Sequence, residues 1–120
     1  MKNAEELDTL AVEFRQCQDI FAAVGDLTRQ SIIISLLAIG CEEGMRVGEL
    51  MQRTHLSRPS VSHHLKILKD AKIVSFHRVG TKNYYYLDPN QSSIRLLKSL
   101  VDHIEGFMTI YWPSQNKNQE

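Results

Sequence analysis

The chain has 120 residues with 14 basic and 14 acidic side chains, so it carries no net charge when its histidines are neutral. This length predicts one domain with a single core. The longest apolar stretch, Ile32 to Ile39, is interrupted by Ser35 and is too short to span a membrane. No basic and apolar leader opens the chain, so we expect a cytoplasmic protein.

Charge is distributed unevenly along the sequence. Residues 53–82 carry seven basic side chains and one acidic one, a balance of +6. Residues 1–52 have a balance of −5 and residues 83–120 a balance of −1. A local positive excess is typical of a surface that replaces counterions along DNA, although a solvated basic face has the same composition.

The first predicted element is a helix from about Ala4 to Val24. Apolar residues recur along it at alternating spacings of three and four, at positions 7, 10, 14, 17, 21 and 24. This spacing is typical of a helix that packs along another helix. Cys17 lies in this apolar row, so we interpret it as a small core residue. Cys17 and Cys41 have neither metal nor disulfide spacing, and we expect both to be reduced thiols.

A second helix is predicted after Gly25-Asp26. Asp26 suits its N-cap, and Gly40 suits its C-cap. The residues from Thr28 to Ile39 are apolar on almost all sides, which predicts a helix in the centre of the fold.

The next segment, residues 46–71, has the pattern of a helix-turn-helix. An apolar-periodic segment reaches Thr54, residues 55–57 break it, and a second such segment follows. Ser57 suits the N-cap of this second helix and Pro59 its first turn. One face of the helix is apolar, with Val61, Leu65 and Leu68. The opposite face, with Pro59, Ser62, His63 and Lys66, has side chains that suit the major groove.

A β-hairpin is predicted directly afterwards. Residues 73–78 and 83–87 are rich in β-branched and aromatic side chains, with the basic tip Val79-Gly80-Thr81-Lys82 between them. A helix-turn-helix followed by such a wing, within the basic segment, predicts binding to double-stranded DNA. The recognition helix 58–71 is expected in the major groove and the wing 73–87 on the flanking backbone. The candidate DNA-binding residues are Arg58, Ser60, Ser62, His63, Lys66, Arg78, Thr81 and Lys82.

After Asp88-Pro89, a last helix is predicted from about Gln91 to Ile110. Its apolar row, at positions 94, 97, 101, 104, 108 and 111, exposes more apolar surface than a chain of this size covers alone. We therefore expect the N- and C-terminal helices to pack together and to form a homodimer across a two-fold axis. The predicted fold is mainly α, with about five helices and a two-stranded wing in a single domain, residues 1–112, followed by a polar tail, residues 113–120.

The order of these elements resembles the ArsR/SmtB family of winged-helix repressors. The matching residues are Asp26-Leu27-Thr28-Arg29, Val47-Gly48-Glu49-Leu50, Leu56 to Leu68, and Gly80 with Tyr84-Tyr85-Tyr86-Leu87. Two positions depart from the family pattern: Leu27 replaces a proline, and Lys72 replaces a glycine after the recognition helix. The resemblance implies a dimeric repressor that releases its operator when an effector binds.

The effector sites of that family are not matched in this sequence. Arg46 and Gly48 stand where one metal site has cysteines. Only His103 is retained from a second site, whose other positions are Asn90, Ser92 and Gly106. The thiol-switch positions correspond to Ile34 and about Trp112. The resemblance therefore predicts no metal cofactor and leaves the effector open.

Two alternatives to the repressor interpretation stay open. A winged helix can serve as a protein-interaction module, which would not require the basic segment. A redox-responsive regulator would use Cys17 and Cys41. An enzyme is not expected, since phosphate loops, nucleophile elbows and catalytic metal motifs are missing. Among the histidines, His64 is interpreted as structural and His103 as part of a solvated face.

Overall fold

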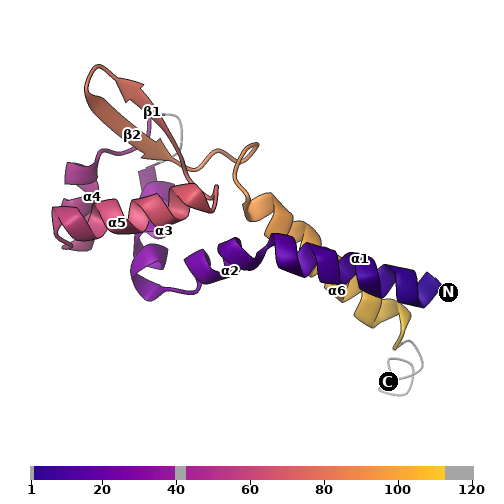
Figure 1. Cartoon of the computed structure of the whole chain (residues 1–120). Helices are drawn as coiled ribbons and strands as arrows, with labels where there is room; N and C mark the ends of the chain where they lie inside the picture. Colours follow the sequence, from indigo (N-terminus) through magenta and orange to yellow (C-terminus); the bar gives the residue numbers. More distant parts are fainter. Residues whose placement is uncertain (1, 40–42, 113–120) are drawn as a thin grey trace. The chain divides into compact units, whose positions relative to one another are not determined.

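The structure, a computed structural model, describes residues 2–39 and 43–112. Its described residues form six helices and one two-stranded antiparallel sheet (Figure 1). The elements are α1 Lys2–Gln16, α2 Gln18–Val24, α3 Leu27–Ile39, α4 Val47–Thr54, α5 Arg58–Asp70, β1 Ser75–Val79, β2 Lys82–Tyr86 and α6 Ile94–Ile110. The mainly α winged-helix fold is thus confirmed.

The chain divides into two compact units. One consists of Met1–Gln18 with Leu96–Glu120, and the other of Asp19–Arg95. We call them the helical unit and the winged-helix unit. The expectation of a single domain over residues 1–112 stays a prediction. Among the described residues, no single helix is long and apolar enough to cross a membrane, and α2 and α3 meet that criterion only as a pair bent by 87°.

The first predicted helix was wrong as a single element, which is why the described residues form six helices rather than about five. The helix is interrupted at Cys17, whose N–H donates to the carbonyls of both Glu13 and Phe14, at 3.1 and 3.2 Å. Such shared bonds are common where a helix ends. In α2, which follows the turn, Ile20 and Ala23 are buried. Neither glycine nor proline marks this position, so local sequence gives no sign of it.

Helix α3 begins as the sequence predicts. Asp26 is its N-cap, with Oδ2 accepting from the backbone N–H of Arg29 at 2.9 Å. Ile32 and Leu36 are buried, but Ile34 and Leu37 are 65% and 63% exposed. The helix therefore packs into the core along one face, while apolar side chains on its other side stay exposed. The predicted C-cap Gly40 lies outside the described residues.

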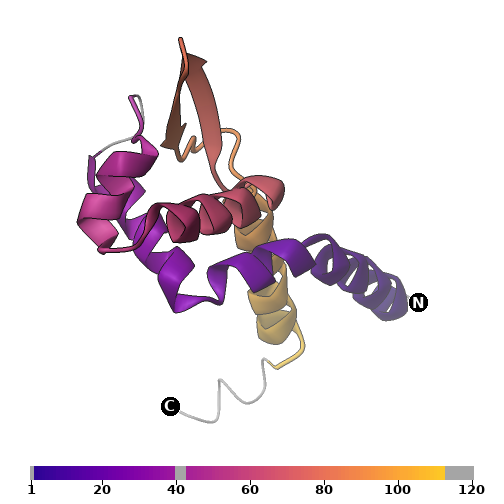
Figure 2. The ribbon, with the colours of Figure 1, turned by 60° about the vertical axis from the view of Figure 1, so that its left-hand side comes forward.

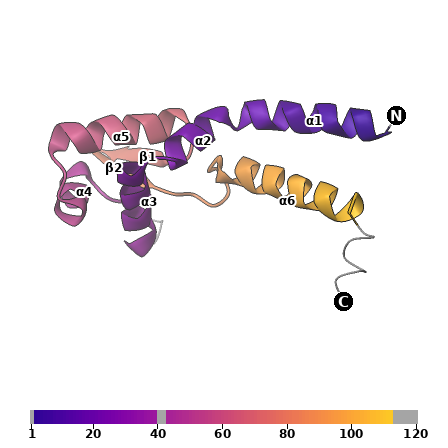
Figure 3. The same ribbon diagram turned by 90° about the horizontal axis from the view of Figure 1, so that it is seen from below.

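Helices α3, α4 and α5 pack against one another, with α3 and α4 on the same side of α5 (Figure 3). Their shared core contains Ile32, Leu50, Val61, Leu65 and Leu68, each at most 1% exposed. Burying one such side chain stabilises the fold by about 1.5–3 kcal/mol. The apolar face predicted for the recognition helix is therefore the one that anchors it.

The wing is an antiparallel hairpin whose strand β2 contacts α3 and whose tip projects from the three helices (Figure 2). Its strands pair from Ser75 opposite Tyr86 to Val79 opposite Lys82, leaving Gly80-Thr81 as the turn. Gly80 has a φ of 65°, a conformation that glycine adopts without a steric penalty. The strands are shifted from the predicted ranges, because Ile73 and Val74 are buried core residues before β1 begins.

In the helical unit, α1 and α6 run antiparallel. The carboxylate of Glu13 lies 2.7 Å from Nδ1 of His103, and the hydroxyl of Tyr111 donates to Glu6 at 2.9 Å. Within α6, Leu100 is fully buried while Val101 and Met108 of the predicted row are more than half exposed. The buried stripe is thus displaced from the predicted row in the single chain. The predicted tail, residues 113–120, lies outside the described residues.

Candidate DNA-binding surface

The start of the recognition helix α5 is fixed by its own first residues. The hydroxyl of Ser57 accepts from the N–H of Ser60 at 3.2 Å, which confirms the predicted N-cap. Pro59 occupies the first turn, where its missing N–H costs no helical hydrogen bond. With the apolar face buried, Ser62 and His63 are exposed on the opposite side. These two residues are therefore available to base edges.

The middle of α5 is held by a partly buried polar contact. His64 Nδ1 lies 3.2 Å from Nη1 of Arg29, and Arg29 also donates to the carbonyls of Ala22 and Ala23 at 3.1 and 2.9 Å. Arg29 thus connects α2, α3 and α5. This contact supports the structural interpretation of His64, whose ring also lies edge-on to that of His63, 5.1 Å between centroids.

Two buried hydroxyls fix the other end of α5. Ser93 Oγ donates to the carbonyl of Ala71, and Ser92 Oγ donates to the carbonyl of Ile73, both at 2.7 Å. Ser92 Oγ also accepts from the N–H of Ile94, so it caps α6. These bonds hold residues 92 and 93 outside the helix, which is why α6 begins three residues later than the predicted Gln91.

Lys72 follows the recognition helix with a φ of 61°. This left-handed conformation is the one that the glycine of the family pattern would adopt without strain. For a residue with a Cβ it costs about 1–2 kcal/mol. Its carbonyl accepts from the N–H of Ser93 at 2.8 Å, so the strained residue is part of the same buried connection.

The wing presents polar groups at its tip and aromatic groups along its strands. His77 stacks on Tyr84, its cross-strand partner, with ring centroids 5.5 Å apart. Arg78 Nε donates to the side-chain oxygen of Asn83 at 3.4 Å, and Thr81 and Lys82 are exposed. The aromatic contact stiffens the hairpin that carries these tip residues.

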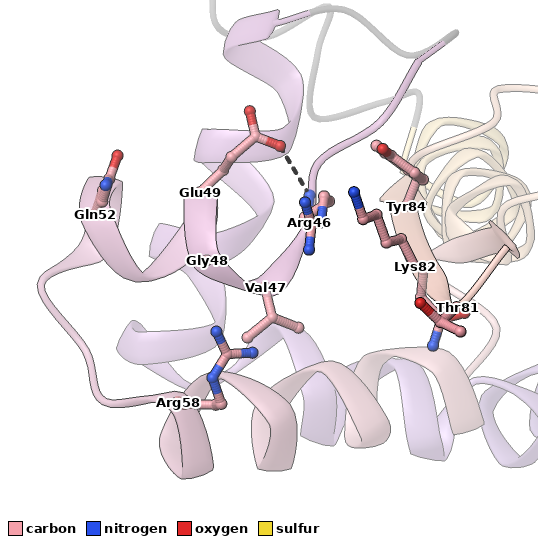
Figure 4. A pocket seen from close by; sticks show the side chains of 10 residues that line it. Arg46, Val47, Gly48, Glu49, Gln52, Arg58, Thr81, Lys82 and Tyr84 are labelled. Carbon is pink, nitrogen blue, oxygen red and sulfur yellow. Dashed lines mark hydrogen bonds between the residues drawn. The ribbon is translucent and has the colours of Figure 1, made fainter. Parts of the chain in front are cut away.

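A cavity of about 700 Å³ lies between α4 and the wing (Figure 4). The start of α4, the start of α5 and the start of β2 all contribute to its walls. It is lined by Arg46, Val47, Gly48, Glu49, Gln52, Arg58, Thr81, Lys82, Asn83 and Tyr84. The three basic residues in this set give it a positive character.

All eight candidate residues lie in the winged-helix unit. The cavity brings together Arg58, Thr81 and Lys82, while Ser60, Ser62, His63, Lys66 and Arg78 do not line it. Lys66 is paired with Asp70 at 2.9 Å on the exposed side of α5. An exposed pair of this kind contributes little to stability, so Lys66 remains free to exchange Asp70 for a phosphate.

Sequence reasoning missed Arg46 as a site residue. Arg46 was grouped with residues 1–52, whose net charge is negative, although it is only seven positions before the start of the basic segment. Extending the basic segment to the start of the helix-turn-helix would have included it. The structure places it on the wall of the same cavity as Arg58 and Lys82.

The sequence predicts reduced thiols at Cys17 and Cys41 and no metal site. Cys17 is 2% exposed, and burial, followed by the nearby charge of Glu13, raises the pKa of its thiol. A buried thiol with a raised pKa is a poor nucleophile. Cys41 lies outside the described residues. In the part of the chain that is described, no three His, Cys, Asp or Glu side chains are grouped so as to hold a metal ion.

A capped recognition helix, a wing and a positively charged cavity lined by residues of both define a winged helix-turn-helix DNA-binding protein. Comparison with known proteins gives the family. Residues 28–75 match the model described as "Bacterial regulatory protein, arsR family". The transcriptional repressor SdpR of Bacillus subtilis is 37% identical over 86 residues, which cover 70% of this chain and 91% of that protein.

Two solved structures share the fold. The ArsR-like transcriptional regulator from Rhodococcus sp. RHA1 has a TM-score of 0.72 at 19% identity, covering 88% of this chain and 92% of that one. The homodimeric winged helix-turn-helix DNA-binding domain from Mycobacterium bovis has a TM-score of 0.59 at 22% identity, covering 82% and 87%. The chain belongs to the arsR family of bacterial regulatory proteins. It is a DNA-binding transcriptional regulator and not an enzyme.

Proposed function

We propose that the chain acts as a homodimeric repressor that binds a palindromic operator, with α5 in the major groove and the wing on the flanking backbone. The observation that carries this proposal is that α5 has an exposed reading face, Ser62 and His63, and that Arg58 at its start lines one cavity with Lys82 of the wing. Small polar side chains suit base edges, and basic ones suit phosphates. A repressor of this kind would act in the cytoplasm.

The dimer is supported by the helical unit. An apolar hollow of about 660 Å³ is lined by Leu10, Ile104, Phe107, Met108 and Trp112, among others. Met108 and Trp112 are 66% and 58% exposed in the single chain. Apolar side chains gathered in this way favour association with a second copy. The M. bovis domain, which shares this fold, is homodimeric, and this agrees with the proposal.

Selection of bound sequences from a random duplex library tests the function directly. We expect an inverted repeat with half-sites about one helical turn apart, since two α5 helices related by a two-fold axis read successive major grooves. A plot of the logarithm of the binding constant against the logarithm of the salt concentration should have a slope of about −0.9 for each phosphate contacted. If duplex binding shows neither a sequence preference nor a dependence on salt, the proposal is rejected and a protein-interaction module is favoured.

A further inference from the structure

The cavity between α4 and the wing is lined by three basic side chains from three separate parts of the chain. Arg46 precedes α4, Arg58 opens α5 and Lys82 opens β2. Figure 4 shows Lys82 extending from the wing toward Arg46, and Arg58 reaching toward Gly48. Within residues 2–39 and 43–112, none of the three forms a salt bridge. Like charges that converge without a partner favour the binding of an anion.

The acidic residue of this cavity is already engaged. Glu49 accepts a hydrogen bond from the backbone N–H of Arg46 at 3.0 Å. This places its carboxylate over the N-terminal end of α4, where a negative charge is favourable. The carboxylate therefore serves the helix cap, and the cavity keeps an excess of positive charge.

Gly48 leaves room for an incoming group. A Cβ at this position would lie 3.9 Å from Nη2 of Arg58, so the guanidinium stands over a bare stretch of helix backbone. The backbone N–H groups in the first turn of a helix lack intrahelical acceptors. In α4 the N–H groups of Glu49 and Leu50 already donate to the carbonyl of Arg46, both at 3.1 Å. An oxyanion between Arg58 and α4 would thus meet the N–H groups of Val47 and Gly48 as well as the cations.

We propose that this cavity binds a phosphate group and that Arg46 is a phosphate-contacting residue outside the recognition helix and the wing. Phosphate fits because arginine can donate two parallel hydrogen bonds to it and Lys82 adds a compact positive charge. When DNA is bound, the ligand is a phosphate of the DNA backbone. This part of the proposal rests on the proposed function. A small phosphorylated molecule has the same chemistry, so the test distinguishes the two sources.

The first experiment compares Arg46→Ala with Arg53→Ala in the full-length chain. Both changes remove one exposed arginine beside or within α4, but only Arg46 lines the cavity. Arg46→Ala should reduce the salt slope of duplex binding by about one, and Arg53→Ala should leave it unchanged. The Arg46 side chain makes no hydrogen bond that caps α4, and circular dichroism checks that the variant is folded. Equal effects of the two variants would exclude Arg46 as a contact to a DNA backbone phosphate, because any loss of binding would then reflect general electrostatics.

The second experiment uses inorganic phosphate without DNA. It is titrated against chloride at matched ionic strength while the amide resonances of Gly48 and Lys82 are followed. Phosphate-specific shifts that are lost in Arg46→Ala and kept in Arg53→Ala support the site. If only this second result is obtained, a small phosphorylated molecule is the ligand. If neither result is obtained, the proposal fails. Failure of the wild-type chain to bind any duplex rejects the proposed function alone, since the phosphate titration still tests the cavity.

Discussion

Nη1 of Arg29 lies 3.2 Å from Nδ1 of His64, joining two helices across 35 residues of sequence. A guanidinium can only donate, so Nδ1 accepts and the imidazole is neutral with its proton on Nε2. Burial lowers the pKa of His64, and the positive charges of Arg29 and His63 lower it further, while Asp26 acts in the opposite direction. The recognition helix is therefore held by a histidine in its uncharged form.

Stability should fall as His64 becomes protonated. Because its pKa is lower in the folded chain than the ordinary value of about 6.5, the unfolded chain binds more protons below that pH. This contribution is complete above about pH 6.5 and is lost as the pH falls further. We expect the free energy of unfolding, measured in urea, to fall less between about pH 8 and pH 5 in His64→Gln than in the unchanged chain. The amide oxygen of the glutamine can still accept a hydrogen bond from Arg29. His63→Gln is the matched control, and an equal change there would contradict this assignment.

Two substitutions on the proposed interface should separate positioning from reading. Lys82→Ala should weaken all duplexes alike and lower the salt slope by about one, because lysine neutralises a phosphate. His63→Ala should change the preferred sequence, because its ring is exposed on the reading face of α5. Binding-site selection with both variants gives the answer. A uniform loss of affinity in His63→Ala would remove that residue from base readout.

The dimer should depend on the apolar face of α6. Ile104→Asp places a carboxylate in the apolar hollow of the helical unit, which costs several kcal/mol when it stays charged and unpaired. We expect monomers by light scattering, together with loss of operator binding. Lys98→Asp introduces the same carboxylate at an exposed position of the same helix and should remain dimeric. A dimeric Ile104→Asp variant would place the interface elsewhere.

Ser93 should contribute more to stability than its size suggests. Its hydroxyl donates to the carbonyl of Ala71 at 2.7 Å inside the fold, so Ser93→Ala leaves a buried acceptor without this donor. We expect the free energy of unfolding to fall by about 1–3 kcal/mol. Thr9→Ala removes an exposed hydroxyl bond to the carbonyl of Glu5 and should change it by less than about 0.5 kcal/mol. Similar losses in both variants would argue against a special role for the buried bond.

Replacing Lys72 with glycine should stabilise the chain. The left-handed backbone at this position costs a residue with a Cβ about 1–2 kcal/mol, and glycine avoids that cost. Part of the gain is offset because glycine makes the unfolded chain more flexible. Lys72→Ala keeps the strain while removing the same charge, so the difference between the two variants in urea unfolding isolates the backbone effect. No difference between them would exclude strain at this residue.

The helix-turn-helix was predictable because its determinants are local. The cap of Ser57 and the apolar spacing of Val61, Leu65 and Leu68 act within one or two helical turns, and such signals are present in the sequence itself. The interruption at Cys17 was not predictable in this way. It follows from where Ile20 and Ala23 must be buried, which tertiary packing decides.

The polar contacts of the site were visible only in part. His64 could be interpreted as structural from its place beside the buried face, but its partner Arg29 lies 35 residues earlier. His103 lies on an exposed face as expected, and it also pairs with Glu13, 90 residues earlier, which the sequence did not indicate. Such partners share no periodicity, so sequence spacing cannot identify them.

The isolated bridge between Met45 and Tyr85 determines how the protein can adapt to DNA. Met45 and Tyr85 exchange two backbone hydrogen bonds of 2.8 Å, which attach the segment before α4 to strand β2 of the wing. A Cβ at the preceding Gly44 would meet the carbonyl oxygen of Tyr85 at 2.7 Å, so the attachment leaves no slack. We therefore expect the duplex to bend wherever its shape does not match the protein surface. Flexible pyrimidine–purine steps between the contacted phosphates would then be preferred, even where no side chain touches a base.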